Sequence, residues 1–279
     1  MPKSKSKRSR PKPEIPRFDH PIFETHCHLD YLPQEELEAV LTRARAVGVD
    51  KIVTIAVAPT NLDTVLELAR SHDQLWCTQG VHPHEAEQFS AATDAAIRSG
   101  AEAPEVVAIG EIGLDYYYDH ADRAVQCRVF ETQLAIAVEL DLPIVVHTRD
   151  ADADTQAILS NFAGDLRRKG VIHSFTSGVA LAEYCLGEGF CLGFNGIATF
   201  NKAQNVRDVI AATPLEQLVI ETDAPYLTPV PYRGTPNAPY FLPFIARYLA
   251  DFLELPVERF LEAVYRNSER LFFASAPSR

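Results

Sequence analysis

Eight short apolar runs alternate along the chain with longer amphipathic stretches, and this alternation limits the fold more than any other feature. The runs are strand-length, rich in β-branched residues and almost free of charge, as strands buried on both faces are. They cover residues 22–23, 52–56, 75–78, 106–109, 144–146, 171–172, 190–194 and 218–220. Between them, apolar residues recur at helical spacing, for example over 34–47, 61–71, 122–140, 150–162, 179–187 and 203–212. Parallel strands joined by crossover helices produce this pattern.

Eight such units fit a single α/β domain, the (β/α)8 or TIM barrel, which typically needs about 250 residues. The chain has 279 residues, and we predict that residues 18–279 form this one domain. Residues 240–273 follow the eighth unit and are predicted to form two or three extra C-terminal helices that close the barrel. A doubly wound open sheet is the alternative fold, but no Gly-x-Gly-x-x-Gly sequence opens a helix here.

Charge is distributed unevenly along the chain. The net charge is −12, yet the first 17 residues hold seven lysines and arginines against one acidic residue, Glu14. This segment is rich in serine, lysine and proline and cannot bury a core, so residues 1–17 are predicted to be a disordered basic tail. Such an arm can contact nucleic-acid phosphates, or it can simply keep the protein soluble. The acidic remainder argues against a protein that coats nucleic acid, because such proteins carry a basic face.

The chain carries no recognisable membrane or export signal. No apolar run approaches the ~18 residues of a membrane span, and the charged start lacks the apolar centre of a secretory signal. Its five cysteines are spread through the sequence without close pairs, which is typical of reduced thiols. We therefore predict a cytoplasmic protein with no membrane partner. No interface is recognisable in the sequence, and a monomer is the default expectation.

Polar residues follow five of the apolar runs, at strand ends that share one face of a barrel. The first run leads into a His-x-His pair, the fourth into a glutamate, the fifth and sixth into a histidine each, and the eighth into an aspartate. These residues are His26, His28, Glu111, His147, His173 and Asp223. Each alone is compatible with a structural role, but barrel active sites lie at this face. Together the six residues predict a metal site.

The number of candidate ligands predicts two metal ions. Four histidines and two carboxylates exceed the three protein ligands that a catalytic zinc ion typically has. We therefore expect two divalent ions, of zinc, manganese or magnesium, bridged by a carboxylate. Glu111 is the natural bridge because a carboxylate has two oxygens. Asp223 is the natural ligand and general base, which would take the proton from a metal-bound water.

Four further residues lie near the predicted site in the sequence. His82 follows the third run and either holds a substrate oxygen or belongs to a turn next to Pro83. Lys202 follows the seventh run and either meets a phosphate or begins a helix. Arg233 lies in a proline-rich loop after Asp223, which suits a wall of the site. Arg149 follows His147 and either grips a phosphate or pairs with an acid; we predict the ion pair.

Several of these segments resemble those of the TatD family of metal-dependent hydrolases. The similar segments are 24–30, 80–84, 110–116, 146–150, 173–175, 221–227 and 233–239, in the same order and at the same spacing. The resemblance runs from about residue 20 to residue 274. It implies a (β/α)8 barrel of the amidohydrolase group and a divalent-metal-dependent deoxyribonuclease. Several members are 3′–5′ exonucleases on single strands, with roles in DNA repair and DNA degradation.

The resemblance also implies roles for individual residues. His26 and His28 would bind the first metal together with Asp223. Glu111 would join them and bridge to the second metal, which His147 and His173 also hold. His82 would sit near the substrate phosphate. The last segment departs from the family pattern, because Thr235, Pro236 and Ala238 stand where members often carry Lys-Arg and Glu.

The sequence thus predicts a metal-dependent phosphodiesterase whose substrate is DNA. We expect a 3′–5′ exonuclease on single-stranded DNA, with a role in DNA repair or degradation. A metal-bound hydroxide would attack the phosphorus, with Asp223 as general base. The first alternative is an amidohydrolase that acts on a small amide, ester or lactone with the same two metals. The second is a non-catalytic metal-binding or interaction protein whose working part is the tail, residues 1–17.

Overall fold

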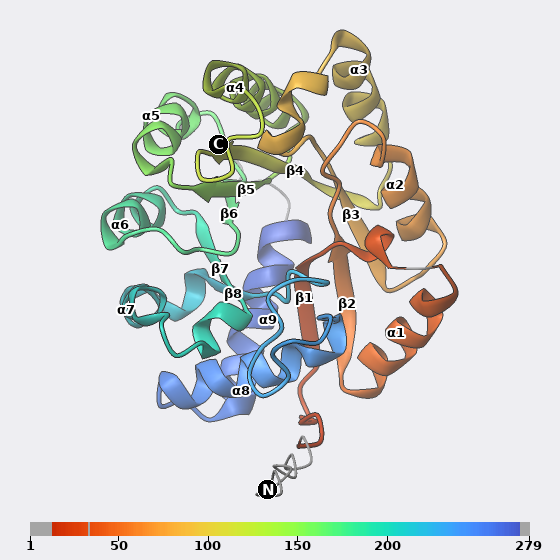
Figure 1. Ribbon diagram of the computed structural model, residues 1–279, viewed down its shortest axis with the longest axis vertical. Helices are drawn as coiled ribbons and strands as arrows, with labels where there is room; N and C mark the ends of the chain where they lie inside the picture. The colour runs from red at the N-terminus through yellow and green to blue at the C-terminus, as the bar shows by residue number, and fades with distance from the viewer. Residues whose placement is uncertain (1–12, 33, 274–279) are drawn as a thin grey trace, which may run out of the picture.

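A computed structural model describes residues 13–32 and 34–273, and its centre is a barrel of eight parallel strands (Figure 1). Each strand pairs with the next one along the chain, in the order β1 to β8. The strands are β1 (Ile22–Cys27), β2 (Val49–Thr54), β3 (Leu75–Gln79), β4 (Val106–Asp115), β5 (Ile144–Arg149), β6 (Gly170–Ile172), β7 (Cys191–Phe194) and β8 (Leu218–Ile220). The predicted TIM barrel is therefore confirmed, and the doubly wound sheet is excluded.

Backbone hydrogen bonds at the ends of the first and last strands join the two edges of the barrel. The Asp223 amide donates a hydrogen bond to the His26 carbonyl at 2.9 Å. The His28 amide donates in turn to the Ala224 carbonyl at 2.7 Å. Both bonds lie at the carboxyl ends of the strands, so closure itself brings the residues that follow β8 next to the histidines at the end of β1.

Helices surround the barrel (Figure 1). They are α1 (Gln34–Ala46), α2 (Leu62–Arg70), α3 (Ala91–Gly100), α4 (Arg123–Leu140), α5 (Asp152–Phe162), α6 (Val179–Gly187), α7 (Gln204–Ala212), α8 (Leu242–Phe252) and α9 (Val257–Phe273). Short 3-10 turns are η1 (Leu29–Tyr31), η2 (Pro83–Gln88), η3 (Gly196–Thr199), η4 (Leu215–Gln217) and η5 (Pro239–Phe241). The predicted C-terminal helices are thus present as η5, α8 and α9. Helix α3 begins at a capping box, in which the side-chain oxygens of Ser90 and Thr93 each accept a hydrogen bond from the other residue's backbone amide.

The two largest apolar regions of the described residues stabilise the barrel. The larger one fills the space between the sheet and the helices. The smaller one lies inside the barrel and includes Val53, Val145 and Val219. Leu271 and Phe272 of α9 pack against this inner region and seal that end of the barrel. The opposite end, where the strands finish, is left to polar side chains.

Strand β4 runs farther than the predicted apolar run, because it includes Glu111 and continues to Asp115. It packs closely against β5 at Gly113, whose φ is +135°. A Cβ atom at Gly113 would collide with the His147 carbonyl oxygen. Glycine is therefore required at this position, and it brings the polar end of β4 next to His147.

Most of the predicted tail, residues 1–12, lies outside the described residues. Residues 13–17 are described, and two of them contact the rest of the chain. The Tyr232 hydroxyl donates a hydrogen bond to the Pro13 carbonyl at 2.7 Å, and Ile15 packs against the large apolar region. None of the described helices is both long and apolar enough to cross a membrane.

Candidate metal centre

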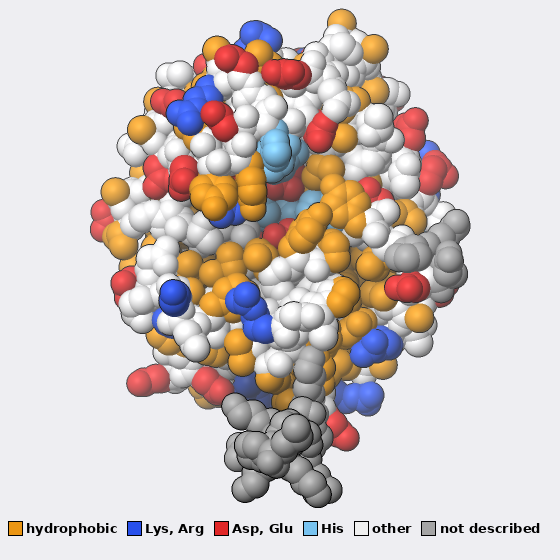
Figure 2. Space-filling view, in the orientation of Figure 1, with side chains coloured by type: hydrophobic (Ala, Val, Ile, Leu, Met, Phe, Trp, Pro, Cys, Tyr) orange, Lys and Arg blue, Asp and Glu red, His pale blue; other side chains and the backbone are white. Residues whose placement is uncertain are grey.

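A cavity of about 1090 Å³ opens at the carboxyl ends of the strands. In Figure 2, histidine and carboxylate side chains form the floor of a hollow, with hydrophobic side chains on its flanks. The predicted residues that line the cavity are His28, His82, Glu111, His147, His173 and Asp223. His26 lies beneath this floor and is fully buried. The structure therefore brings all six predicted ligands, and His82, into one place.

Glu111 lies at the centre of this group, and its two oxygens face different histidines. Oε2 is 3.5 Å from His26 Nε2 and 4.0 Å from His28 Nε2. Oε1 is 2.7 Å from His173 Nε2 and 3.2 Å from His147 Nδ1. Burial alone would raise the pKa of the Glu111 carboxyl, but the facing histidines hold that pKa well below its usual range. The carboxylate is therefore ionised between two sets of rings.

Asp223 faces the first of these sets. Its Oδ1 atom is 3.5 Å from His28 Nε2 and 3.7 Å from His26 Nε2. Burial opposes ionisation, but the hydrogen bond from His28 and the charge of His26 lower the pKa of Asp223 below its ordinary value. Asp223 is also one of the residues that border the cavity, so an ionised carboxylate stands between the histidine pair and the open space.

Several buried ring nitrogens in this cluster have no hydrogen-bond partner in the described part of the chain. They are both ring nitrogens of His26 and of His173, and Nδ1 of His28. A buried polar atom without a partner costs free energy, and proteins rarely leave several together. Three groups of side chains have ligand atoms close enough to share a cation: His26, His28 and Glu111; His82, Glu111 and His147; and His26, His173 and Glu221. Neutral imidazole and carboxylate are suitable donors for divalent metals, so these residues fit such ions.

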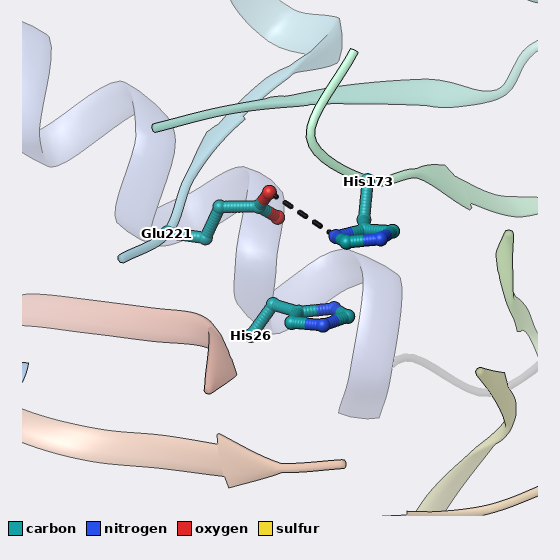
Figure 3. Close-up of side chains that lie close together, drawn as sticks. All are labelled: His26, His173 and Glu221. Carbon is teal, nitrogen blue, oxygen red and sulfur yellow. Dashed lines mark ion pairs between the residues drawn. The ribbon is translucent and has the colours of Figure 1, made fainter. Parts of the chain in front are cut away.

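Two outer carboxylates orient the second set of rings. Asp115 Oδ2 lies 3.0 Å from His147 Nε2, and Glu221 Oε1 lies 3.4 Å from His173 Nδ1 (Figure 3). A carboxylate at one ring nitrogen keeps the proton there and leaves the other nitrogen free to bind a metal. The free nitrogens are then His147 Nδ1 and His173 Nε2, and both face Glu111. Figure 3 also shows the His26 and His173 rings parallel, with centroids 3.8 Å apart.

The hydrogen bond of His82 defines which of its nitrogens carries the proton. Nδ1 accepts from the His84 backbone amide at 3.1 Å, so a neutral ring has its proton on Nε2. Burial lowers the pKa of His82 well below its ordinary value, which keeps the ring neutral. Nε2 lies 3.5 Å from Glu111 Oε1 and therefore presents a donor to the cluster. A donor at this position can hold a substrate oxygen, whereas binding a cation would require this nitrogen without its proton.

The predicted basic residues lie farther out. Lys202 and Arg233 are exposed, and neither lines the cavity. The Arg233 guanidinium lies 3.6 Å from the ring centroid of Phe200, which does line it. The ion pair predicted for Arg149 is wrong, because no carboxylate of the described residues pairs with it. Its guanidinium lies over the Tyr117 ring instead, 4.1 Å from the centroid.

Three carboxylates that were not predicted from the sequence contact residues of the cluster or the strands that carry it. They are Glu24, Asp115 and Glu221, and all are buried. Glu24 accepts hydrogen bonds from the His26 and Thr222 amides and so links β1 to the end of β8. Burial raises the pKa of Glu24 to about 8. Glu24 and Glu221 each directly follow an apolar run, which was the available signal, whereas Asp115 lies six residues beyond its run and carried none.

The chain is similar to known proteins over almost its whole length. Residues 23–273 match the family described as TatD related DNase. The chain is 35% identical over 252 residues to an uncharacterized metal-dependent hydrolase of Bacillus subtilis, YabD, covering 90% of this chain and 98% of that protein. It is 38% identical over 222 residues to the 3′-5′ ssDNA/RNA exonuclease TatD of Erwinia tasmaniensis, covering 77% and 85%. The crystal structure of the TatD homologue YjjV of Escherichia coli K12 superposes with a TM-score of 0.86 at 33% identity, covering 91% and 98%.

Proposed function

This chain belongs to the TatD family of metal-dependent hydrolases, and on that premise we propose that it removes nucleotides from the 3′ end of single-stranded DNA. The observation that carries the proposal is the position of Glu111, a buried carboxylate whose two oxygens face two different pairs of histidines. Two-metal sites bridged in this way clamp the oxygens of a phosphoryl group. The family relative named as a 3′-5′ exonuclease supports the choice of substrate and direction.

The proposal assigns two cations to the cluster. Asp223, His26 and His28 would hold the first, and His147 and His173 the second, with Glu111 shared by both. The unpartnered Nε2 atoms of His26 and His173 support this assignment, because both face Glu111 and ligation would satisfy them. Divalent ions bound here would offset the charge of the phosphate oxygens and lower the pKa of a bound water.

The residues of the chain then have distinct tasks. Asp223 is ionised and borders the cavity, so it can accept the proton of the attacking water. His82 Nε2 can donate a hydrogen bond to a phosphate oxygen, and it stays neutral because it is buried. Asp115 and Glu221 hold the His147 and His173 rings in place. A cytoplasmic location and a role in DNA repair or degradation stay predictions.

The test is digestion of a 5′-labelled single strand by the purified protein. The reactions contain EDTA, EDTA followed by added metal, or the Asp223→Ala variant, with Asp94→Ala on the outer helix α3 as the matched control. We expect a ladder of shortening products that metal restores and that the Asp223→Ala variant fails to produce. Intact DNA with every divalent metal tested would contradict the proposal. The amidohydrolase prediction would then be tested on a panel of esters, amides and lactones.

A further inference from the structure

Exposed tyrosines gather at the mouth of the cavity. Tyr31, Tyr117, Tyr118 and Tyr226 all line it, with exposed fractions of 45%, 57%, 52% and 54%. They are four of the seven large hydrophobic residues that are exposed in the described part of the chain. Their hydroxyls form no hydrogen bond within that part. A group of exposed rings around one cavity marks a surface that binds a ligand.

The four rings form two walls on opposite sides of the barrel mouth. Tyr117 and Tyr118 follow β4 and form the first wall; their amides donate to Asp115 Oδ1 at 3.0 and 2.9 Å. Tyr31 and Tyr226 follow β1 and β8 and form the second wall, with ring centroids 6.4 Å apart. Because β1 and β8 are neighbours and β4 lies across the barrel, the metal-binding cluster lies between the walls. Figure 2 shows hydrophobic side chains on two sides of the hollow.

Both walls are fixed to residues of the cluster. Asp115, which holds the first wall, also accepts from His147. In the second wall the Tyr226 amide donates to the Asp223 carbonyl at 2.9 Å. The Tyr31 ring stacks on His28 at 5.2 Å with an angle of 15° between planes. A ligand held by the rings is therefore held at a defined position relative to Glu111 and Asp223.

The charge around the cavity is unsuited to binding a phosphate backbone by electrostatics. Arg149 is the one lysine or arginine among the described residues that line it, against Glu85, Glu111, Asp115, Asp150, Asp152 and Asp223. The Arg149 guanidinium lies over both rings of the first wall, 4.1 Å from Tyr117 and 5.1 Å from Tyr118. Apart from bound metals and Arg149, the exposed surfaces of the four rings are the main attractive surface for a nucleic-acid strand.

We infer that the two tyrosine walls are stacking sites for nucleobases, one for each nucleotide that flanks the phosphodiester at the cluster. This inference rests on the proposed function and adds the means by which the strand is held. Aromatic rings bind unpaired bases whatever the sequence, because every base has a flat face. A base inside a duplex is already stacked on its neighbours and offers no free face. The walls therefore select unpaired strands, of any sequence, over duplex.

The test compares a strand that has bases with one that lacks them. The metal-loaded protein is titrated with a fluorescent, phosphorothioate-linked thymidine oligomer, which resists cleavage, and with an abasic oligomer of the same length and linkage. Binding is measured by anisotropy for wild type, Tyr117→Ala, Tyr226→Ala and the matched Tyr117→Phe and Tyr226→Phe variants. Thermal melting of each variant verifies that it is folded.

We expect each alanine variant to bind the thymidine oligomer roughly 5- to 140-fold more weakly, the range that follows from the loss of one base–ring contact. The phenylalanine variants should bind as wild type does, because the ring and not the hydroxyl makes the contact. Binding of the abasic oligomer should be weak and unchanged by any of the substitutions. Equal affinity of wild type for both oligomers, or equal losses on both, would overturn the inference.

The two proposals can fail separately. If the alanine variants lose base-dependent binding but wild type leaves ordinary single-stranded DNA intact with every metal, the stacking sites stand and the nuclease proposal fails. If wild type digests DNA and the alanine variants digest it at the same rate with the same affinity, the nuclease proposal stands and the stacking sites are rejected.

Discussion

The inside of the barrel has two layers built from the same strands, one apolar and one ionisable. On β5, β6 and β8 one valine of the inner apolar region is followed two residues later, within the strand or just after it, by a polar residue on the same face. The pairs are Val145 and His147, Val171 and His173, and Val219 and Glu221. The apolar layer is sealed by α9, and the ionisable layer faces the cavity. A step of two residues along the strands thus separates the part that stabilises the fold from the part that carries the chemistry.

The two layers differ in whether their polar atoms need hydrogen-bond partners that the described chain does not supply. The apolar layer needs only close packing, which Phe272 and its neighbours supply. The ionisable layer leaves nitrogens of His26 and His173 without partners within the described chain. Such a layer costs folding free energy until a cation binds it. The comparison therefore predicts that substitutions in the ionisable layer reduce activity and leave a folded protein. Substitutions in the apolar layer should instead reduce stability and leave the metal site intact.

The largest effect is expected from removing a carboxylate of the ionisable layer. Glu111→Ala or Asp223→Ala should reduce the rate of DNA hydrolysis by more than about 1,000-fold, as loss of a central catalytic group does. Neither side chain belongs to the apolar layer, so both variants should still melt cooperatively. Steady-state digestion assays and calorimetry would check this. Loss of the cooperative transition in either variant would erase the distinction between the layers.

A substitution in the apolar layer should have the reverse outcome, and Phe272 of α9, which closes that layer, is the position to test. Phe272 is 2% exposed, and its ring centroid is 5.9 Å from that of Phe23. Phe272→Ala should lower the free energy of unfolding by about 3–5 kcal/mol, while the metal content of the folded protein stays the same. Urea denaturation and elemental analysis would measure both quantities. Phe273→Ala is the matched control and should cost less, because Phe273 is 38% exposed. An unchanged unfolding free energy for Phe272→Ala would contradict the account.

Glu24, at the seam between β1 and β8, predicts a pH dependence of stability in protein stripped of metal. Burial raises its folded-state pKa to about 8 from an ordinary 4.5. A raised pKa means that its contribution is full below pH 4.5 and is lost as the pH rises towards 8. The free energy of unfolding should therefore fall by about 3 kcal/mol more in wild type than in Glu24→Gln between pH 5 and pH 8. Parallel slopes for the two proteins in denaturation curves would rule this out.

The smallest effect is expected from Asp115, which contacts the cluster through His147. Asp115 accepts from both His147 and His84, although burial opposes its ionisation, and these hydrogen bonds hold the pKa of Asp115 below its ordinary value. Asp115→Asn should weaken metal binding by about 10- to 100-fold, as loss of an orienting carboxylate does. Calorimetric metal titration would measure this against Asp154→Asn, a surface control that accepts from the Tyr116 hydroxyl. Equal metal affinities in the two variants would show that Asp115 does not support metal binding.

The sequence sufficed for the barrel and for the inner cluster, because both depend on local patterns. Apolar runs of strand length and helical spacing predict the elements, and polar residues after the runs predict which side chains meet at one face. The extension of β4 to Asp115 was missed because polar and glycine residues interrupt its apolar run. The role of Glu221 behind His173 depends on how β6 and β8 approach each other, which no local pattern contains.

The wall of the cavity was predicted less well than its floor. Arg149 was expected to pair with an acid, yet it lies over Tyr117, whose position depends on the turn that Asp115 holds. Lys202 and Arg233 were predicted to contact the substrate. Both are exposed and neither lines the cavity, so their contact with substrate stays a prediction. Loop residues lack the alternation that fixes strand residues, so their side chains cannot be directed from sequence alone.

The most direct test of the account is the number of metal ions that one chain binds. Wild type and Glu111→Ala would be loaded with manganese or zinc, dialysed to remove free metal and analysed by mass spectrometry for metal per chain. The account predicts two ions per chain in wild type and fewer in Glu111→Ala, because both ions share that carboxylate. One ion or none in wild type, or the same number in both proteins, would contradict it.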